Sequence, residues 1–474
     1  MRSRLVQLIG LDFGSTTCSA VVAEARLTEH CATGRRELEQ AVTRYRSALV
    51  MTPFVGQTED VLDLEAVEEL IEGWLRAAEV KPDELFGGGA LITGLAAGTA
   101  NATQLTALLR KRLQDAVIAT ASDPCLESFV AFMGSCAKAS VKEPQTPFLN
   151  LDIGGGTTNL ALGMNGEVLR TGCLQIGARH LRFAPGTLRL IGTSSLGRRQ
   201  LQWLGIETEL GETLDSAALE RLLDYYVTLL YSACTGQRSE LQTALGHQIE
   251  QVELRIPEGM PPPKLAFSGG VGALILARLA GDTQPPSTCY GDLGPHLAER
   301  IVRSPLLHGE IVRSEHAGRA TVYGLLEHAT VISGSTLSVS RPDLLPLRDL
   351  PILGSISSQS SPIALHDALL LLRRSPDGGA LRVRLFTADL SELRTLGMRL
   401  RECICALHFP PTQPIVLLLA ENLGKVLGAY VTGFSALNIN LLVLDEISVR
   451  SARFVQLGRL QDQVIPVSFY GLLP

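Results

Sequence analysis

The chain lacks the paired cysteines that bind metal ions. No CxxC pair occurs among its nine cysteines, so neither a zinc site nor the ligand set of an iron–sulfur cluster is visible. Their number is odd and their positions are scattered, which indicates buried thiols in a reducing cytosol. The cysteines are Cys18, Cys31, Cys125, Cys136, Cys173, Cys234, Cys289, Cys403 and Cys405.

Two common nucleotide-binding fingerprints are also missing. The chain contains no GxxxxGK[ST] and no GxGxxG, which excludes a P-loop and a dinucleotide-binding turn. The DxHxxG motif is absent too, so we do not expect His180 or His296 to be a cobalt ligand.

Long apolar runs and a basic excess are missing as well. Glu421, Asn422 and Lys425 interrupt the apolar stretch 414–431, and Asp12 cuts the N-terminal apolar run too short for a signal-peptide core. The net charge of −6 and the pI of about 5.9 argue against general binding to nucleic acids or anionic membranes. We therefore expect no nucleic-acid partner and no membrane partner.

The composition is that of a large folded protein. Hydrophobic residues make up 46% of the 474 residues, charged residues 19%, and the mean hydropathy is positive, which is not typical of a disordered chain. A chain of this length exceeds one compact core, so roughly two to four domains are expected.

The most informative stretch is LDIGGGTTN at 151–159, which follows the apolar run 148–151. A strand that ends in an acid and three glycines exposes backbone N–H groups to an approaching anion, which predicts a phosphate-binding loop. Asp152 suits a hard cation such as Mg²⁺, through the waters of the ion. A tight glycine turn between two strands is the alternative. The predicted phosphate contacts are Gly154, Gly155, Gly156, Thr157 and Thr158.

Two further glycine turns favour the phosphate interpretation. GLDFGSTT at 10–17 again follows an apolar run and combines an acid with glycine and hydroxyls, and LAFSGGVG at 265–272 is a short strand that ends in a glycine pair. Three such turns in this order are more specific than any one of them. They add Gly14, Ser15, Thr16, Thr17, Ser268, Gly269, Gly270 and Gly272 to the predicted nucleotide-binding residues.

The order of these turns resembles the actin, sugar-kinase and heat-shock-chaperone superfamily of ATPases. The resemblance implies an α/β fold with duplicated actin-like (ribonuclease-H-like) ATPase domains and the cofactors ATP and Mg²⁺. It also implies that the first two loops face each other around the phosphates, that Asp12 and Asp152 flank the metal, and that SGGVG supports the adenosine. Segment 319–324 resembles the second interdomain connection, although Leu325 follows Gly324 where another glycine is usual.

Glu127 is the other predicted catalytic residue besides Asp152. Pro124 marks a helix start, which places Glu127 in the first turn. In the superfamily the helix that crosses between the domains often carries an acid that faces the γ-phosphate, so Glu127 is our candidate to orient the attacking water. A first-turn Glu that only complements the helix dipole is an equal alternative.

The chain is predicted to form a first ATPase domain at 1–147, a second at 148–338 and a smaller α/β domain at 339–474. Each ATPase half begins with a hairpin, at 5–25 and at 159–171, and the Asn165-Gly166 pair is a type I′ turn signal. Apolar stripes predict helices at 63–79 and 216–233, and a polar helix is expected at 239–251. In the last domain, strands at 381–387, 414–420 and 440–444 alternate with helices at 391–407 and 424–431. The glycines of 424–428 either bind an anion or let the helix pack closely, and we favour close packing.

Several phrases resemble the ethanolamine ammonia-lyase reactivating factors in register over most of the chain. They are LNLDIGGGTTNLAL at 149–162, SDPCLES at 122–128, SGGVG at 268–272, DLGP at 292–295, ISGSTL at 332–337, GKVLG at 424–428 and VLDEISVR at 443–450. The resemblance implies ATP-driven release of damaged cobalamin from ethanolamine ammonia-lyase, which would be the partner. It also implies a cytoplasmic location, with a bacterial microcompartment as a further place of work.

An ATP-binding cleft of this type does not choose among functions. A small-molecule kinase for a sugar or carboxylate and an actin-like assembly protein are the alternatives. The sequence leaves open whether the chain forms homo-oligomers, what surface meets the client, and whether hydrolysis or mere nucleotide binding is needed.

Overall fold

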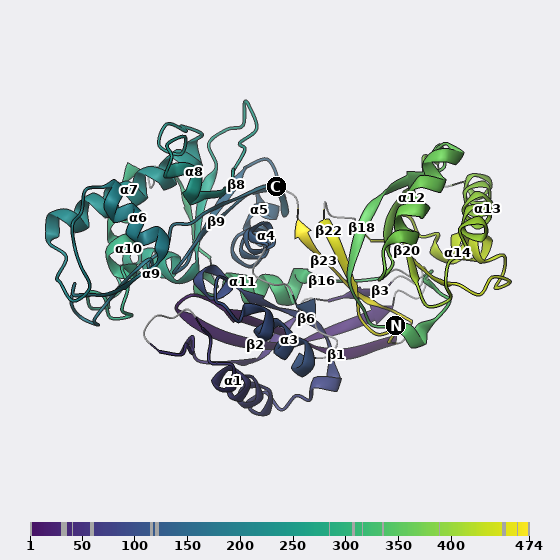
Figure 1. Cartoon of the computed structure of the whole chain (residues 1–474), viewed down its shortest axis with the longest axis horizontal. Coiled ribbons are helices and arrows are strands. Elements are labelled where there is room, and N and C mark those ends of the chain that lie inside the picture. The colour runs from purple at the N-terminus through teal and green to yellow at the C-terminus, as the bar shows by residue number, and fades with distance from the viewer. Residues whose placement is uncertain are drawn as a thin grey trace.

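Over its described residues, the computed structural model shows three large β-sheets and one two-stranded sheet, with helices packed on the large ones (Figure 1). In Figure 1 the first sheet lies below, the second at the left and the third at the right. The structure describes residues 2–29, 36–39, 41–56, 61–113, 117–118, 123–283, 285–305, 309–314, 316–333, 336–387, 389–447, 452–461 and 463–472. The sequence also predicts a strand at 115–120, and part of it lies outside these residues, as do parts of the phrases at 122–128, 332–337 and 443–450.

The first sheet has the order β3-β2-β1-β6-β7, and β4 and β5 also pair with β2. β1 is antiparallel to β2 and parallel to β6. Its strands are β1 (Arg2–Phe13), β2 (Thr17–Glu29), β3 (Arg36–Leu38), β4 (Val42–Arg46), β5 (Val50–Met51), β6 (Leu85–Ile92) and β7 (Val117–Ile118). The helices of this part are α1 (Leu64–Ala77), α2 (Gly94–Ala97), α3 (Ala102–Leu113), α4 (Pro124–Ser135) and α5 (Ala137–Lys142).

The second sheet repeats this scheme in the order β13-β10-β9-β8-β14-β15. β8 is antiparallel to β9 and parallel to β14, as β1 is to β2 and β6. Its strands are β8 (Phe148–Ile153), β9 (Thr158–Met164), β10 (Glu167–Leu174), β13 (Glu250–Val252), β14 (Lys264–Ser268) and β15 (Ile311–Val312). A small hairpin of β11 (Leu181–Phe183) and β12 (Leu190–Thr193) and the helices α6 (Ser195–Trp203), α7 (Ser216–Thr235), α8 (Gly246–Ile249), α9 (Gly269–Leu279) and α10 (Gly294–Val302) complete this part. The shared topology is the duplication that the two hairpins predicted.

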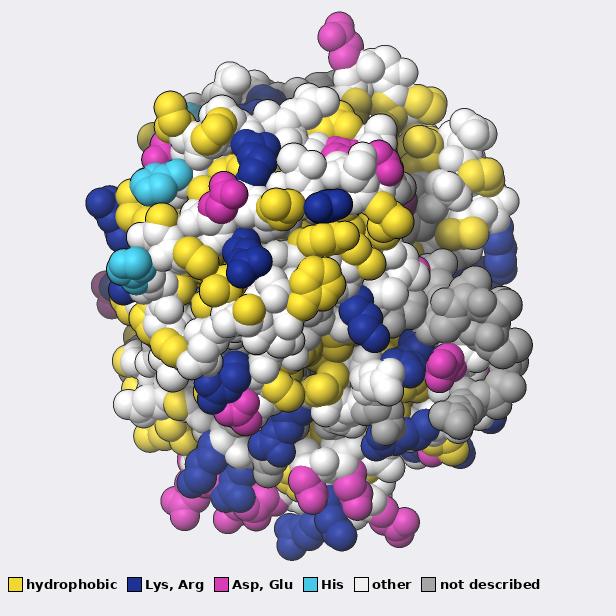
Figure 2. All heavy atoms as spheres, turned by 90° about the vertical axis from the view of Figure 1, so that its right-hand side faces the viewer, with side chains coloured by type: hydrophobic (Ala, Val, Ile, Leu, Met, Phe, Trp, Pro, Cys, Tyr) yellow, Lys and Arg dark blue, Asp and Glu magenta, His cyan; other side chains and the backbone are white. Residues whose placement is uncertain are grey.

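The third sheet has the order β16-β23-β22-β18-β19-β20-β21-β17. Its strands are β16 (Thr330–Ile332), β17 (Ser338–Val339), β18 (Leu347–Ser357), β19 (Gly379–Arg384), β20 (Pro414–Leu419), β21 (Asn440–Leu444), β22 (Ala452–Leu457) and β23 (Pro466–Leu472). The helices α12 (Pro362–Arg374), α13 (Leu390–Leu407) and α14 (Gly424–Thr432) alternate with the parallel strands β18 to β21. The outer face of this part shows hydrophobic side chains interspersed with Lys and Arg (Figure 2).

Local sequence signals explain much of this architecture. Asn165 and Gly166 both have positive φ, at 53° and 78°, as a type I′ turn requires. On α1 the predicted stripe Val67, Ile71 and Trp74 is buried. The alternating strands and helices of the third sheet are confirmed.

Three further expectations can be compared with the structure. The polar helix at 239–251 is wrong, because this segment forms turns, the four-residue helix α8 and strand β13, which pairs with β10. The glycines of α14 do allow close packing: a Cβ on Gly428 would lie 2.2 Å from Ser338 Oγ, and Asp445 accepts the Gly424 N–H. The domain boundaries stay predictions; β16 and β17, which precede residue 339 or span it, belong to the third sheet.

Helices α4 and α11 (Ala320–Gly324) cross with almost no space between them. A Cβ built on Gly134 would lie 1.9 Å from the Ala320 carbonyl oxygen, and one on Gly324 would lie 1.9 Å from the Val130 carbonyl oxygen. No other residue fits there without a backbone shift. The predicted connection at 319–324 therefore packs through its single glycine on the helix that carries Glu127.

We expect Gly134→Ala to lower the free energy of unfolding by about 1–3 kcal/mol, because its methyl group must push two helices apart. Chemical denaturation monitored by circular dichroism measures the change. Gly73→Ala is the matched control: Gly73 lies within α1 and a Cβ there meets nothing within 4 Å, so the control should be neutral or up to about 1 kcal/mol more stable. Equal losses in the two variants would contradict the crossing.

Candidate functional site

The two predicted phosphate loops share one local hydrogen bond. Gly14 N–H donates to the Thr17 carbonyl at 3.0 Å, and Gly154 N–H donates to the Thr157 carbonyl at 2.9 Å. Each bond closes the turn between the paired strands of its sheet, β1–β2 and β8–β9. The duplication thus extends from the topology to the loops themselves.

The two loops touch each other. A Cβ on Gly155 would lie 2.6 Å from Thr16 Oγ1, and one on Gly156 would lie 2.9 Å from Ser15 Oγ. Ser15 is buried, and its hydroxyl accepts the Leu95 N–H at 2.7 Å. The structure therefore brings the first two predicted loops together, and glycine is required because a side chain would separate them.

Three N–H groups of the second loop are unused. Among the described residues, the N–H groups of Gly155, Gly156 and Thr157 make no hydrogen bond. The carbonyls of Gly154 and Gly155 are instead held by the N–H groups of Ala178 and Arg179, at 3.1 and 2.6 Å. Successive free N–H groups in a glycine turn form a concave anion-binding site.

The hydroxyls of the second loop differ in their surroundings. Thr158 is fully buried and donates its hydroxyl to the Ile176 carbonyl at 2.8 Å, so that hydroxyl is engaged within the fold. Thr157 is partly exposed, and its hydroxyl accepts only a long 3.4 Å contact from the Asn159 amide. Thr157 is therefore the better placed of the two for a ligand oxygen.

Three acids gather beside these loops. Burial raises the pKa of Asp152 to about 7, and the nearby charge of Asp12 adds to this rise. Burial likewise raises the pKa of Asp12 to about 6. The pKa of Glu127 is raised well above its usual value, first by burial and then by the charges of Asp152 and Asp12. The structure thus places the three predicted acids within electrostatic reach of one another.

The acids have partners on their protein side. Ser268 Oγ donates to Asp152 Oδ1 at 2.5 Å, and Thr321 Oγ1 of α11 donates to Asp12 Oδ2 at 2.9 Å. The buried Asp12 Oδ1 accepts no hydrogen bond from the residues that the structure describes. A buried carboxylate oxygen without a partner suits a bound cation or its water.

No group of three or more His, Cys, Asp and Glu side chains is arranged to hold a metal within the described ranges. Two carboxylates acting through water still fit Mg²⁺, since this ion keeps several waters and takes its other ligands from phosphate oxygens. Burial disfavours the charged forms of Asp12 and Asp152, and the charge of Asp12 adds to this for Asp152, so a cation between the loops would offset both effects.

The third turn lies next to the second loop. Gly269 has φ +79°, and a Cβ there would lie 2.5 Å from the Ile153 carbonyl oxygen. Ser268 is fully buried. Its hydroxyl donates to Asp152 and accepts from the Asn150 amide, so it is engaged within the fold. A Cβ on Gly270 would meet nothing within 4 Å, and Gly272 packs on Phe267. Gly270 thus leaves open space beside the loops, and the role of this turn toward adenosine stays a prediction.

Sequence reasoning missed several residues of the site. Asp292 of DLGP is buried, accepts the Gly294 N–H at 2.9 Å and receives the Thr16 hydroxyl at 3.4 Å. Gly94 has φ +57° and packs on Ser15, although its segment carries no acid. The segment 177–180 supports the second loop. Asp292 stood in the phrase DLGP without a role assigned to it, and no motif marked Gly94 or the segment 177–180, where a glycine was the only local signal.

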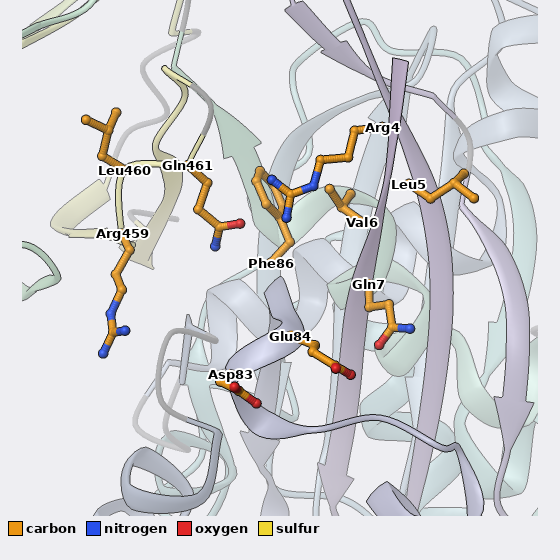
Figure 3. A pocket seen from close by; sticks show the side chains of 10 residues that line it. All are labelled: Arg4, Leu5, Val6, Gln7, Asp83, Glu84, Phe86, Arg459, Leu460 and Gln461. Atoms are coloured by element: carbon orange, nitrogen blue, oxygen red, sulfur yellow. The ribbon is translucent and has the colours of Figure 1, made fainter. Parts of the chain in front are cut away.

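The hollow drawn in Figure 3 lies away from the glycine turns. It has a volume of about 490 Å³ and is lined by Arg4, Gln7, Phe86 and Gln461 among others, between β1, β6 and the turn before β23 (Figure 3). It contains no residue of the three glycine turns. Among the described helices, none is both long and apolar enough to cross a membrane.

Two sheets of the same topology, joined at paired glycine loops that each follow an acid, define an actin-like ATPase fold. Comparison with known sequences then identifies the particular family. The chain belongs to the family of the ethanolamine utilisation protein EutA, whose sequence model matches residues 4–473.

Two curated relatives match the whole chain. The ethanolamine ammonia-lyase reactivase EutA of Escherichia coli K12 is 28% identical over 482 residues, covering 100% of this chain and 99% of that protein. The reactivase EutA of Salmonella typhimurium LT2 is 28% identical over 495 residues, with the same coverage. Among solved structures, a Ppx/GppA phosphatase from Aquifex aeolicus aligns with a TM-score of 0.36 and 11% identity, covering 68% of this chain and 99% of that one.

The raised pKa values predict a pH-dependent stability. Asp12 and Asp152 ionise at higher pH in the folded chain than in the unfolded chain, so their favourable contribution is complete below about pH 4 and is lost as the pH rises through about 6 to 7. Without nucleotide and magnesium, Asp152→Asn should therefore be more stable than the wild type at pH 8, by about 1–3 kcal/mol, and this gain should shrink toward pH 5.

Denaturant unfolding at several pH values measures this gain. Asp343→Asn is the control, because Asp343 is exposed and Arg341 lowers its pKa, so no such gain is expected there. A gain for Asp152→Asn that is the same at pH 5 and pH 8 would contradict the assignment.

Proposed function

We propose that this protein is an ATP-dependent reactivating factor for ethanolamine ammonia-lyase, which releases damaged cobalamin from the lyase so that intact adenosylcobalamin can bind. The observation that carries the proposal is the family match over residues 4–473, and both curated relatives are named as reactivases of that lyase. The paired loops and the three acids supply what a nucleotide-driven factor needs.

The loop N–H groups and the acids would divide the work of binding MgATP. The free N–H groups of Gly155, Gly156 and Thr157 would bind phosphate oxygens, with the first loop on the other side. Asp12 and Asp152 would hold Mg²⁺ through its waters, and the ion would supply positive charge to the phosphates. Gly270 leaves open space where adenosine would rest.

Glu127 is suited to orient the water for hydrolysis. It lies in the first turn of α4, and its pKa is raised first by burial and then by the charges of Asp152 and Asp12. The water oxygen forms a bond to the γ-phosphorus while the bond to the β,γ-bridging oxygen breaks, which yields ADP and inorganic phosphate. Because the charges of Asp12 and Asp152 act on Glu127, we favour this role over that of a residue that only complements the helix dipole.

Two helices lead from the acids to the third sheet. Asp123 is the N-cap of α4, and its carboxylate accepts the N–H groups of Gly471 and Leu472 in β23, at 2.5 and 3.2 Å. α11 carries Thr321, which bonds Asp12, and the chain continues from α11 into β16. β16 and β23 pair with each other. A change at the acids on hydrolysis would thus reach the edge of the third sheet, which supports a nucleotide-dependent grip on a client.

The damaged cofactor would stay with the client until its release. The chain has no DxHxxG motif, and His180 is buried behind the second loop, so no residue is proposed as a cobalt ligand. The client is ethanolamine ammonia-lyase, and the place of work is the cytoplasm or a bacterial microcompartment in it.

A reactivation assay tests the function directly. Ethanolamine ammonia-lyase inactivated during turnover is incubated with this protein, MgATP and fresh adenosylcobalamin, and deaminase activity is followed. Activity should return with the wild type and not with Asp152→Asn, which loses the metal-binding charge. A phosphorylated product from a panel of sugars and carboxylates, without reactivation, would replace the proposal with a kinase. Nucleotide-dependent light scattering without reactivation would replace it with an assembly protein.

Glu127→Gln separates hydrolysis from binding. The variant keeps the shape of the side chain but cannot accept a proton from water, so the rate of ATP hydrolysis should fall by about 100-fold or more while the Kd for MgATP changes little. Single-turnover hydrolysis and calorimetry measure the two quantities. A weakened Kd with an unchanged hydrolysis rate would show that Glu127 is structural.

A further inference from the structure

Three consecutive residues hold the three glycine carbonyls of the second loop. Ala178 N–H and Arg179 N–H donate to Gly154 and Gly155, and the third donor is a side chain: His180 Nε2 lies 2.8 Å from the Gly156 carbonyl oxygen. The approach is close, because a Cβ on Gly177 would lie 2.4 Å from the Gly155 carbonyl. This arrangement fixes the orientation of three successive peptide planes.

The hydrogen-bond network assigns the His180 tautomer. The Gly156 carbonyl can only accept, so Nε2 carries the proton. Nδ1 then accepts from Ser194 Oγ at 2.8 Å, while that oxygen accepts the Gly197 N–H at 2.9 Å. Burial lowers the pKa of His180 to about 4, which keeps the ring neutral near pH 7. Both ring nitrogens are thus satisfied in one fixed orientation.

Each hydrogen bond to a carbonyl oxygen of the loop also fixes the direction of the N–H group of the following residue. In a planar trans peptide the C=O and N–H point in opposite directions. The Gly154 carbonyl therefore sets the Gly155 N–H, the Gly155 carbonyl sets the Gly156 N–H, and the Gly156 carbonyl sets the Thr157 N–H. The first two planes are held by backbone donors, and His180 alone among the described residues holds the third.

We propose that His180 is a positioning residue of the nucleotide site. Its neutral imidazole donates a hydrogen bond to the Gly156 carbonyl oxygen, and this bond orients the Thr157 N–H toward a phosphate oxygen of the bound nucleotide. This inference rests on the proposed function. Glycine turns its peptide planes easily, and a reversed Gly156 plane would present a carbonyl oxygen to the phosphates in place of a donor.

Two amide substitutions separate the two ring nitrogens. The amide of Gln reaches the place of Nε2 and keeps a donor for Gly156, whereas the shorter Asn reaches only the place of Nδ1 and keeps a partner for Ser194. His180→Asn should weaken binding of MgATP and MgADP by about 10- to 100-fold, the loss expected for one charge-assisted hydrogen bond. His180→Gln should stay within about threefold of the wild type.

Calorimetry on the 474-residue chain measures the affinities for MgATP and MgADP. Thermal unfolding of the same samples shows whether a loss of affinity goes together with a lower melting temperature. A purely structural histidine would make affinity follow the melting temperature in both variants, which would overturn the proposal, as would equal affinities for Asn and Gln. If the wild type bound no nucleotide, the proposed function itself would be contradicted. Failure of the His180 proposal and failure of the proposed function thus give different results.

A measurement on the wild type covers the case in which a variant does not fold. In protein with ¹⁵N-labelled histidine, the His180 ring should show a protonated Nε2 and an unprotonated Nδ1 that does not titrate between pH 5 and 8. Its Nε2 signal should shift on addition of MgATP. A ring protonated at Nδ1 alone, or one that titrates near pH 6.5, would overturn the assignment.

Discussion

The structure depends on the contact between two glycine loops that come from different sheets. Gly155 and Gly156 approach Ser15 and Thr16 so closely that a methyl group at either glycine would collide with them. Beside this contact the N–H groups of Gly155, Gly156 and Thr157 make no hydrogen bond within the described residues, and the acids of two strands lie near one another. Every other feature of the site either supports these loops or responds to them.

Asp12, Asp152 and Glu127 lie beside the contact between the two glycine loops and determine the electrostatics there. Burial raises the pKa of all three acids, and the charge of Asp12 raises the pKa of Asp152 and Glu127 further, so their charged forms are unfavourable unless a cation offsets them. Under the proposed function, the free energy of binding MgATP would therefore be linked to the relative position of the two sheets. Helices α4 and α11 cross at Gly134 and Gly324; Asp123 at the start of α4 binds β23, and residues 325–329 lead from α11 to β16, so the third sheet would share in this linkage.

Much of this architecture was readable from local patterns. The strand-then-glycine phrases located the loops, the Asn165-Gly166 pair located a hairpin, and Pro124 located the start of the helix that carries Glu127. These signals are reliable because they reflect backbone geometry within a few residues. The helix predicted at 239–251 was wrong because a polar pattern along the chain does not report a distant partner. The end of this segment forms β13, which pairs with β10.

By itself, then, the sequence determined the order of the elements, the duplicated hairpins and the three glycine turns, because each follows from the conformational limits of neighbouring residues. Only the tertiary structure decided which atoms meet. It brought His180 behind Gly156, Asp292 to Thr16 and Asp123 to the end of β23, over separations of 24 to 348 residues. Such contacts depend on how separate sheets and helices pack, and no periodicity along the chain records the distance between them.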